Sequence, residues 1–176
     1  MQAKLNPQFV AATTKGKLNF PGFQEIFDFT AAGGEASTSV TVDGDTDKEY
    51  LIYCRDIEAD YVSLRLNNDS TANVYGRQYL LNDGGAINAA RGTANQMYIC
   101  EPYGESFMSL LTPTGFLKTV SSACYNITSG TTVDEVFHQV WSYNSTSNIT
   151  SLDFLMESGN FTAGTRIMVY ARRSQT

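Results

Sequence analysis

The sequence predicts a single all-β domain, an antiparallel β-sandwich, with an extended N-terminal arm before it. From about Gln24 onward, short segments rich in β-branched and aromatic residues alternate with Gly, Asn, Asp and Ser at intervals typical of sandwiches and barrels. The first 19 residues lack such segments, because Asn6-Pro7 and Lys15-Gly16-Lys17 interrupt any periodic apolar pattern. We therefore expect the arm over residues 1–22 and the sandwich over residues 23–176.

Size and composition set the broad class of protein. A chain of 176 residues buries roughly 70% of its unfolded surface on folding, so it needs neither a disulfide nor a metal ion to hold a core. The net charge of −6 argues against nucleic acid as the main partner, although a local basic patch stays compatible with it. The N-terminus lacks an apolar signal region and no run approaches about eighteen apolar residues, so we expect neither an export signal nor a membrane span.

The arm and the start of the body differ in charge. Residues 1–19 contain three lysines and no acidic residue, whereas residues 23–60 contain ten acidic residues against Lys48 and Arg55. A basic arm thus precedes an acidic body. We expect the arm to contact a partner through its lysines and phenylalanines, namely Lys4, Phe9, Lys15, Lys17 and Phe20.

Within the body we expect eight or nine strands. They come from eleven candidate segments, of which a few merge or drop out: residues 25–30, 37–42, 49–55, 61–66, 78–81, 96–101, 106–112, 117–126, 136–143, 150–156 and 165–171. In residues 61–66, alternation places Val62, Leu64 and Leu66 on one face and leaves Ser63 and Arg65 on a face that meets water. In residues 165–172 both faces carry bulky side chains, so the second face should meet something other than bulk water.

The connections between these segments give further expectations. A helix competes with a strand only at residues 86–90 and 132–141, and we take the second stretch as a strand because Val136, His138 and Val140 also alternate. Asp43-Gly44 is typical of a hairpin turn. Residues 157–160 should likewise join the last two strands as a hairpin.

Most candidate sites have a structural explanation that is stronger than the chemical one. The acidic run at residues 43–49 alternates carboxylates as a calcium loop does, but Lys48 stands where an EF-hand needs glycine, so a solvated hairpin tip is favoured. We interpret the glycines at 76, 84, 85 and 92 as loop glycines, since no phosphate-binding lysine accompanies them.

Catalytic side chains are scarce in this sequence. Cys54, Cys100 and Cys124 match no zinc or CxxC spacing, and we expect them to be buried thiols. The single histidine, His138, favours a packed strand residue over a general base. We therefore expect no enzyme, no metal and no cofactor.

Two stretches resemble a family of phage virion proteins that includes capsid decoration proteins and fibre or spike subunits with a jelly-roll domain. One is Tyr61-Val62-Ser63-Leu64-Arg65-Leu66-Asn67-Asn68-Asp69-Ser70 with Asn73 and Tyr75 after it. The other is Asn148-Ile149-Thr150-Ser151-Leu152-Asp153-Phe154, followed by Gly159-Asn160-Phe161 and by Gly164-Thr165-Arg166-Ile167-Met168-Val169-Tyr170. The similar part spans roughly residues 49–173, and the chain departs from the family where Ala171 replaces a common glycine.

The resemblance implies a sandwich of jelly-roll type, a homotrimer and a structural role in a virion. The leading expectation is a capsid decoration or cement protein on the capsid surface, which contacts the major capsid protein through the arm. The alternative is a receptor- or carbohydrate-binding fibre or spike domain that recognises a host surface glycan. That alternative requires Tyr75, Tyr79 and Tyr103 to cluster at an exposed end, whereas the simpler interpretation of the tyrosines is packing within the sandwich.

Overall fold

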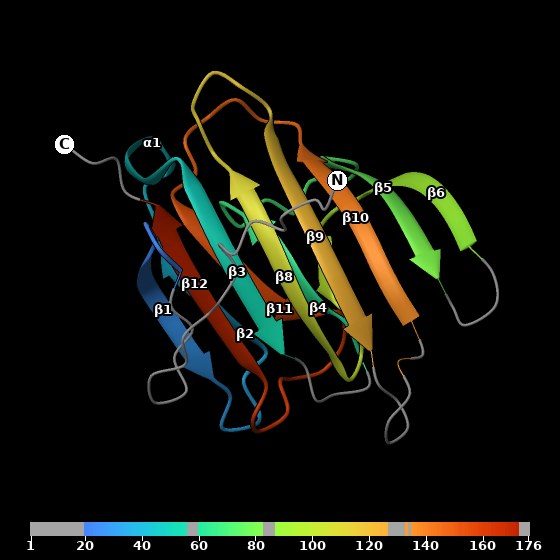
Figure 1. Cartoon of the computed structure of the whole chain (residues 1–176). Coiled ribbons are helices and arrows are strands. Elements are labelled where there is room, and N and C mark those ends of the chain that lie inside the picture. Colours follow the sequence, from blue (N-terminus) through green and yellow to red (C-terminus); the bar gives the residue numbers. More distant parts are fainter. Residues whose placement is uncertain (1–19, 56–59, 83–86, 127–132, 134, 173–176) are drawn as a thin grey trace, which may run out of the picture.

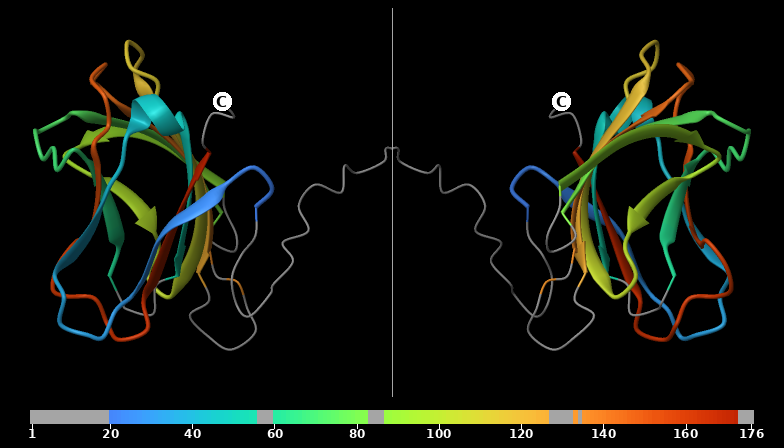
Figure 2. Two further views of the ribbon diagram at one scale, coloured as in Figure 1. Left: turned by 90° about the vertical axis from the view of Figure 1, so that its left-hand side faces the viewer. Right: turned by 90° about the vertical axis from the view of Figure 1, so that its right-hand side faces the viewer.

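Strands of β-branched and aromatic residues build two antiparallel sheets packed face to face. The computed structural model describes residues 20–55, 60–82, 87–126, 133 and 135–172, and in this part of the chain the two sheets account for twelve strands (Figure 1). The nearly all-β, two-sheet architecture that the sequence predicts is confirmed. Figure 2 shows the two layers from the side.

The two sheets differ in size. The large sheet has eight strands, in the order β1 (Gln24–Thr30), β12 (Arg166–Arg172), β3 (Glu49–Arg55), β8 (Gly104–Leu111), β9 (Lys118–Asn126), β10 (Glu135–Tyr143), β5 (Tyr75–Asn82) and β6 (Ile87–Ala94). The small sheet has four, in the order β2 (Ser37–Thr41), β11 (Ser151–Met156), β4 (Val62–Leu66) and β7 (Met97–Cys100). The large sheet therefore has twice as many strands as the small one, and β6 lies at one of its edges.

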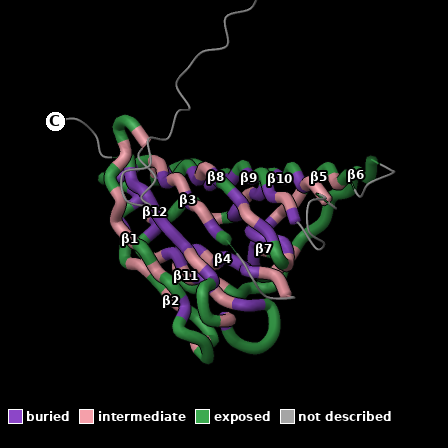
Figure 3. Tube along the Cα trace, turned by 60° about the horizontal axis from the view of Figure 1, so that its bottom comes forward, coloured by how far each residue is buried: buried purple, intermediate pink, exposed green. Residues whose placement is uncertain are grey.

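The core lies between the two sheets, where alternate side chains of each strand meet (Figure 3). The large sheet contributes Ile52 and Trp141, and the small sheet contributes Leu64 and Phe154, all of them with at most 1% of their surface exposed. Full burial of a side chain of this size stabilises the fold by about 1.5–3 kcal/mol. Of these four, Leu64 lies on the face of residues 61–66 that the alternation in the sequence predicts to be apolar.

The number of strands and the assignment of two glycines differ from expectation. The described residues form twelve strands instead of eight or nine, because every candidate segment forms a strand and β6 adds one that was not among the candidates. The helical interpretation of residues 86–90 is wrong for residues 87–90, which pair with β5. All residues of β6 but Ala94 are exposed, so no buried face left an alternating signal in the sequence (Figure 3). Gly76 and Gly92 lie inside β5 and β6, so their assignment to loops is wrong as well. Gly84 and Gly85 lie outside the described residues.

The strand interpretation of β10 is confirmed, but both hairpin predictions are wrong. Strands β2 and β3 lie in different sheets, and between them the short helix α1 (Gly44–Asp47) replaces the expected turn. Strands β11 and β12 also lie in different sheets, since β11 pairs with β2 and β4 while β12 pairs with β1 and β3. Turn residues show where the chain reverses, but they do not show which sheet the next strand joins.

The two expectations about outward faces have opposite outcomes. Ser63 is fully buried, because Gln96 covers it: Gln96 Nε2 donates to Ser63 Oγ at 3.2 Å, and the Arg65 guanidinium donates to Gln96 Oε1 at 2.8 Å. The expected wet face of β4 is therefore wrong. On β12, Met168 and Tyr170 are buried, which confirms that this face does not meet bulk water.

Helix α1 has four residues, and none of the helical segments among the described residues is long and apolar enough to cross a bilayer.

Candidate functional site

Phe20 and the turn that follows it lie on the outer face of the large sheet. Lys4, Phe9, Lys15 and Lys17 lie outside the described residues, and only Phe20 of the predicted partner-binding set can be placed. Its ring lies edge-to-face against Tyr170, with 5.0 Å between the ring centroids, and 6.4 Å from the ring of Phe107. Phe20 thus covers part of the outer face of β12, which the sequence predicted to be shielded from bulk water by an unidentified segment.

The segment after Phe20 turns sharply into β1. Pro21 and Gly22 form its corner, with the Phe23 N–H donating to the Phe20 carbonyl at 3.0 Å and Gly22 at φ 82°. Proline followed by a residue at positive φ is the pattern of a type II turn, which explains why glycine stands there. The Arg172 guanidinium lies over the Phe23 ring at 4.7 Å and holds the turn against β12.

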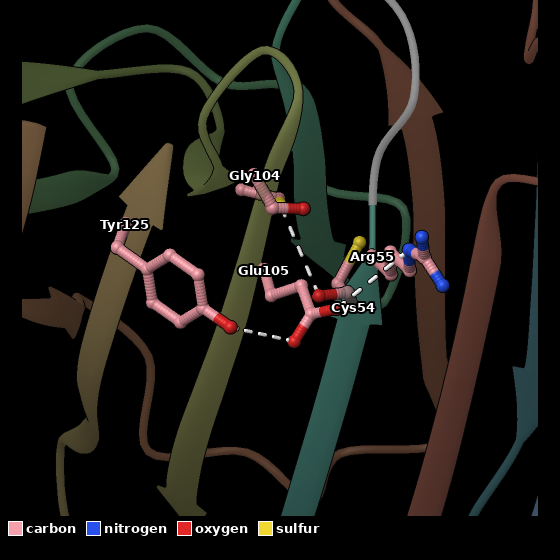
Figure 4. A network of polar contacts seen from close by, with 6 residues as sticks. Cys54, Arg55, Gly104, Glu105 and Tyr125 are labelled. Carbon is pink, nitrogen blue, oxygen red and sulfur yellow. Dashed lines mark hydrogen bonds and ion pairs between the residues drawn. The ribbon is translucent and has the colours of Figure 1, made fainter. Parts of the chain in front are cut away.

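The outer face of the large sheet also carries a polar row at one end of β3, β8 and β9. Figure 4 shows Glu105 between Tyr125 and Arg55. The Tyr125 hydroxyl donates to Glu105 Oε2 at 2.7 Å, and Arg55 Nε lies 3.6 Å from Glu105 Oε1. Burial, with the hydrogen bond to Glu105 second, raises the pKa of Tyr125 to about 12. Glu105 is therefore both hydrogen-bonded and ion-paired.

The three tyrosines required for a sugar-binding platform do not form one. Tyr75 is fully buried and stacks on Tyr143 with 5.1 Å between ring centroids. Its hydroxyl accepts a hydrogen bond from Leu66 N at 2.9 Å. Tyr79 is half-buried beneath the Arg77 guanidinium, 4.1 Å from its ring, and Tyr103 alone is well exposed. Packing within the sandwich, the simpler expectation, accounts for Tyr75 and Tyr79.

The acidic run serves as a helix cap. Asp43 is the N-cap of α1: its carboxylate accepts hydrogen bonds from Thr46 Oγ1 at 2.7 Å and from Asn148 Nδ2 at 2.9 Å. These bonds lower the pKa of Asp43. Among the described residues, no three His, Cys, Asp or Glu side chains converge to hold a metal ion.

Glu101 is a buried carboxyl group that the sequence analysis did not single out. It follows β7 directly and is 4% exposed, and its Oε2 has no hydrogen-bond partner among the described residues. Burial, and secondarily the charge of Glu135, raises the pKa of Glu101 to about 7, although a hydrogen bond with Tyr61 lowers it. Such a group can take up or release a proton near neutral pH.

No local signal in the sequence marks Glu101, because its burial comes from the packing of β7 against β8 and β9. The Glu101 N–H donates to Cys124 Sγ of β9 at 3.1 Å, which joins the end of β7 to a strand of the other sheet.

The prediction for the three thiols is confirmed, whereas the prediction for the histidine is wrong in part. Cys54, Cys100 and Cys124 are buried thiols, as predicted. A hydrogen bond with Cys100, and then burial, raises the pKa of the Cys124 thiol, which keeps it in the unreactive protonated form. His138 does lie in a strand, but its side chain is exposed, so the expectation of a packed residue is wrong.

Residues 61–70 and 148–154, which carry part of the family resemblance, meet in the small sheet, whereas residues 166–170 of the second stretch lie in β12 of the large sheet. Strand β4 pairs with β11, and Asn67, at φ 56°, follows β4 directly. Asn67 Oδ1 accepts from Thr150 N at 2.7 Å, and Asn67 Nδ2 donates to the Asn148 carbonyl at 2.9 Å. The next residue, Asn68, donates its N–H to Asp153 Oδ2 at 2.8 Å. Residues 61–70 and 148–154 therefore belong to one hydrogen-bonded unit.

Comparisons with models of protein families, with curated proteins and with solved structures found no match for this chain. What the molecule itself defines is an antiparallel two-sheet β protein with an aromatic contact between Phe20 and Tyr170 on the outer face of its eight-stranded sheet.

Proposed function

We propose that this protein is a structural virion protein, a capsid decoration or cement protein on the capsid surface. The observation that carries the proposal is the unit formed by Asn67, Asn68 and the start of β11. The residues that resemble phage virion proteins are about 80 positions apart in the chain, yet they bond directly to one another. Two separate motifs that resemble one family gain weight when they build a single piece of structure.

The jelly-roll topology belongs to the same proposal, and the strand order supports it. An eight-stranded jelly roll pairs its strands 1-8-3-6 in one sheet and 2-7-4-5 in the other. If β5–β6 and β9–β10 are insertions, the remaining strands follow that rule, with β1-β12-β3-β8 in one sheet and β2-β11-β4-β7 in the other. In this interpretation both insertions extend the large sheet.

The arm is the part that binds the shell, and its partner is the major capsid protein. Three lysines and no acidic residue lie in residues 1–19, while nine basic and 18 acidic side chains, a net charge of −9, remain in residues 20–176. An extended segment that orders on binding covers a large surface at modest net affinity, because chain entropy is lost. Three arms on one homotrimer then add avidity.

Deletion of residues 1–18 tests this role. The experiment measures cosedimentation of the purified protein with shells assembled from the major capsid protein, for the full chain, the deletion, and two matched triple variants at Lys4, Lys15 and Lys17. Replacement by arginine should preserve binding, whereas replacement by glutamate and the deletion should abolish it without loss of the folded body. A deletion variant that still decorates shells contradicts the arm's role. Binding to a glycan array in place of shells would favour the receptor-binding alternative.

A further inference from the structure

The outer face of the large sheet has two halves of different character. Over β1, β12 and β3 it carries ion pairs: Arg166 lies 3.0 Å from Asp28, and Arg172 lies 3.2 Å from Glu49. Over β8, β9, β10, β5 and β6 the outward positions are almost free of charge. We call these five strands' outward side the neutral face.

Two rows of side chains cross the middle of the neutral face in register. One row contains Phe107, Ala123, His138, Leu80 and Ala89. The adjacent row contains Ser109, Ser121, Val140, Gln78 and Arg91. Only Arg91 and His138 among these ten can carry a charge, although exposed protein surface commonly has about 25–35% charged residues.

The apolar side chains in these two rows are exposed to solvent. Leu80, Phe107 and Val140 expose 52%, 44% and 53% of their surface, and Ile87 at one corner exposes 78%. Glu105, the carboxylate at another corner, is already neutralised by Arg55 and Tyr125. Contiguous apolar exposure of this kind on a soluble domain marks a surface for association.

We propose that the neutral face is the surface through which copies of this chain bind one another. The argument for a second copy as the occupant is electrostatic. Residues 20–176 carry a net charge of −9, so two copies repel unless they meet where neither carries acidic side chains. The cores of protein interfaces are depleted of charge in the same way. The inference rests on the proposed function for the number of copies, which is three.

The size and shape of the neutral face are compatible with a contact between copies of the chain. Five strands about 4.8 Å apart, over about seven residues of 3.3 Å each, give a footprint on the order of 550 Å² before corrugation. Stable interfaces bury roughly 800 Å² of accessible surface per partner, so a footprint of this size supplies a part of such a contact. The face also has an open hollow of about 620 Å³ lined by Gly76, Arg91, Thr93, Thr119, Val140 and Ser142, into which a neighbour's side chain can enter.

The test is the solution mass of the full-length chain, measured by light scattering coupled to size exclusion. The wild type should have a mass near three chains. Val140→Glu places a carboxylate at the centre of the face, and it should shift the mass to one chain at the same protein concentration. Ser37→Glu adds the same charge at an exposed position of β2 on the small sheet and should leave three chains. Circular dichroism and thermal unfolding check that each variant is folded.

A second variant keeps the inference open to refutation if Val140→Glu fails to fold. Ser121→Lys adds a cation at the exposed position beside Val140 in register, and it should also give one chain. A wild type of one chain, or a folded variant of either kind that keeps three chains, overturns the inference. Neither result decides the proposed function, because shell binding by the arm is measured separately by cosedimentation.

Discussion

Replacement of Glu101 by glutamine should stabilise the protein at neutral and alkaline pH. The raised pKa of Glu101, from an ordinary 4.5 to about 7, corresponds to a preference of about 3 kcal/mol for the neutral carboxyl in the folded state. Below pH 4.5 the carboxyl is protonated in both states and contributes nothing. Between pH 4.5 and 7 the unfolded chain loses the proton while the folded protein keeps it, so stability falls as the pH rises. Above pH 7 the folded protein holds a buried carboxylate at the full cost.

Glutamine has nearly the same shape and does not ionise, so Glu101→Gln should remove this pH dependence. We expect the free energy of unfolding of the variant to match the wild type near pH 4.5 and to exceed it by up to about 3 kcal/mol at pH 8. Urea unfolding at pH 4.5, 6 and 8, with unchanged slopes, measures the difference. Glu135→Gln is the companion variant, and it should recover part of the gain because Glu135 is the second cause of the raised pKa. A difference between Glu101→Gln and wild type that is the same at all three pH values refutes the reasoning.

Two other substitutions or treatments follow from buried groups. Tyr75→Phe leaves the buried Leu66 N–H without its acceptor, so the free energy of unfolding should drop by about 1–3 kcal/mol in urea titrations, and Tyr79→Phe serves as a half-buried control. A loss as large for the control as for Tyr75→Phe would count against the hydrogen bond as the cause. The three thiols should resist a disulfide reagent at pH 8 in the native protein and react fully in denaturant, because all three are buried and the pKa of Cys124 is raised. Rapid labelling of the native protein would contradict that account.

The sequence predicts best those strands that bury one face. In β3, Tyr50, Ile52 and Cys54 alternate with less buried neighbours, and the expected bounds at residues 49–55 match the observed strand. β6 has no buried face, since its pairing with β5 alone makes it a strand. Its alanines and Gly92 carry no strand preference, so local propensity could not reveal it.

What escaped prediction depends on contacts between distant segments. Ser63 is polar and alternates outward, yet Gln96, 33 positions later, covers it. Tyrosine is a residue type that stacks on sugars, but the buried Tyr75 hydroxyl accepts a hydrogen bond from the Leu66 N–H. Asp43-Gly44 is a sequence typical of hairpin turns, but here Asp43 caps α1. Its carboxylate accepts a hydrogen bond from Asn148, which lies 105 positions later in the chain. In each case the deciding partner is invisible to a local pattern.

The antiparallel pairing of β1 with β12 has a mechanical consequence. Gln24 lies opposite Ala171, so the chain enters β1 and leaves β12 at the same end of the pair. A force applied between the residues before β1 and the residues after β12 would therefore break the cross-strand hydrogen bonds one after another from that end, instead of loading all of them together in shear. The first contacts to feel such a force are the Phe20 ring on Tyr170 and the Arg172 guanidinium on Phe23. Both contacts must break before β1 and β12 begin to separate.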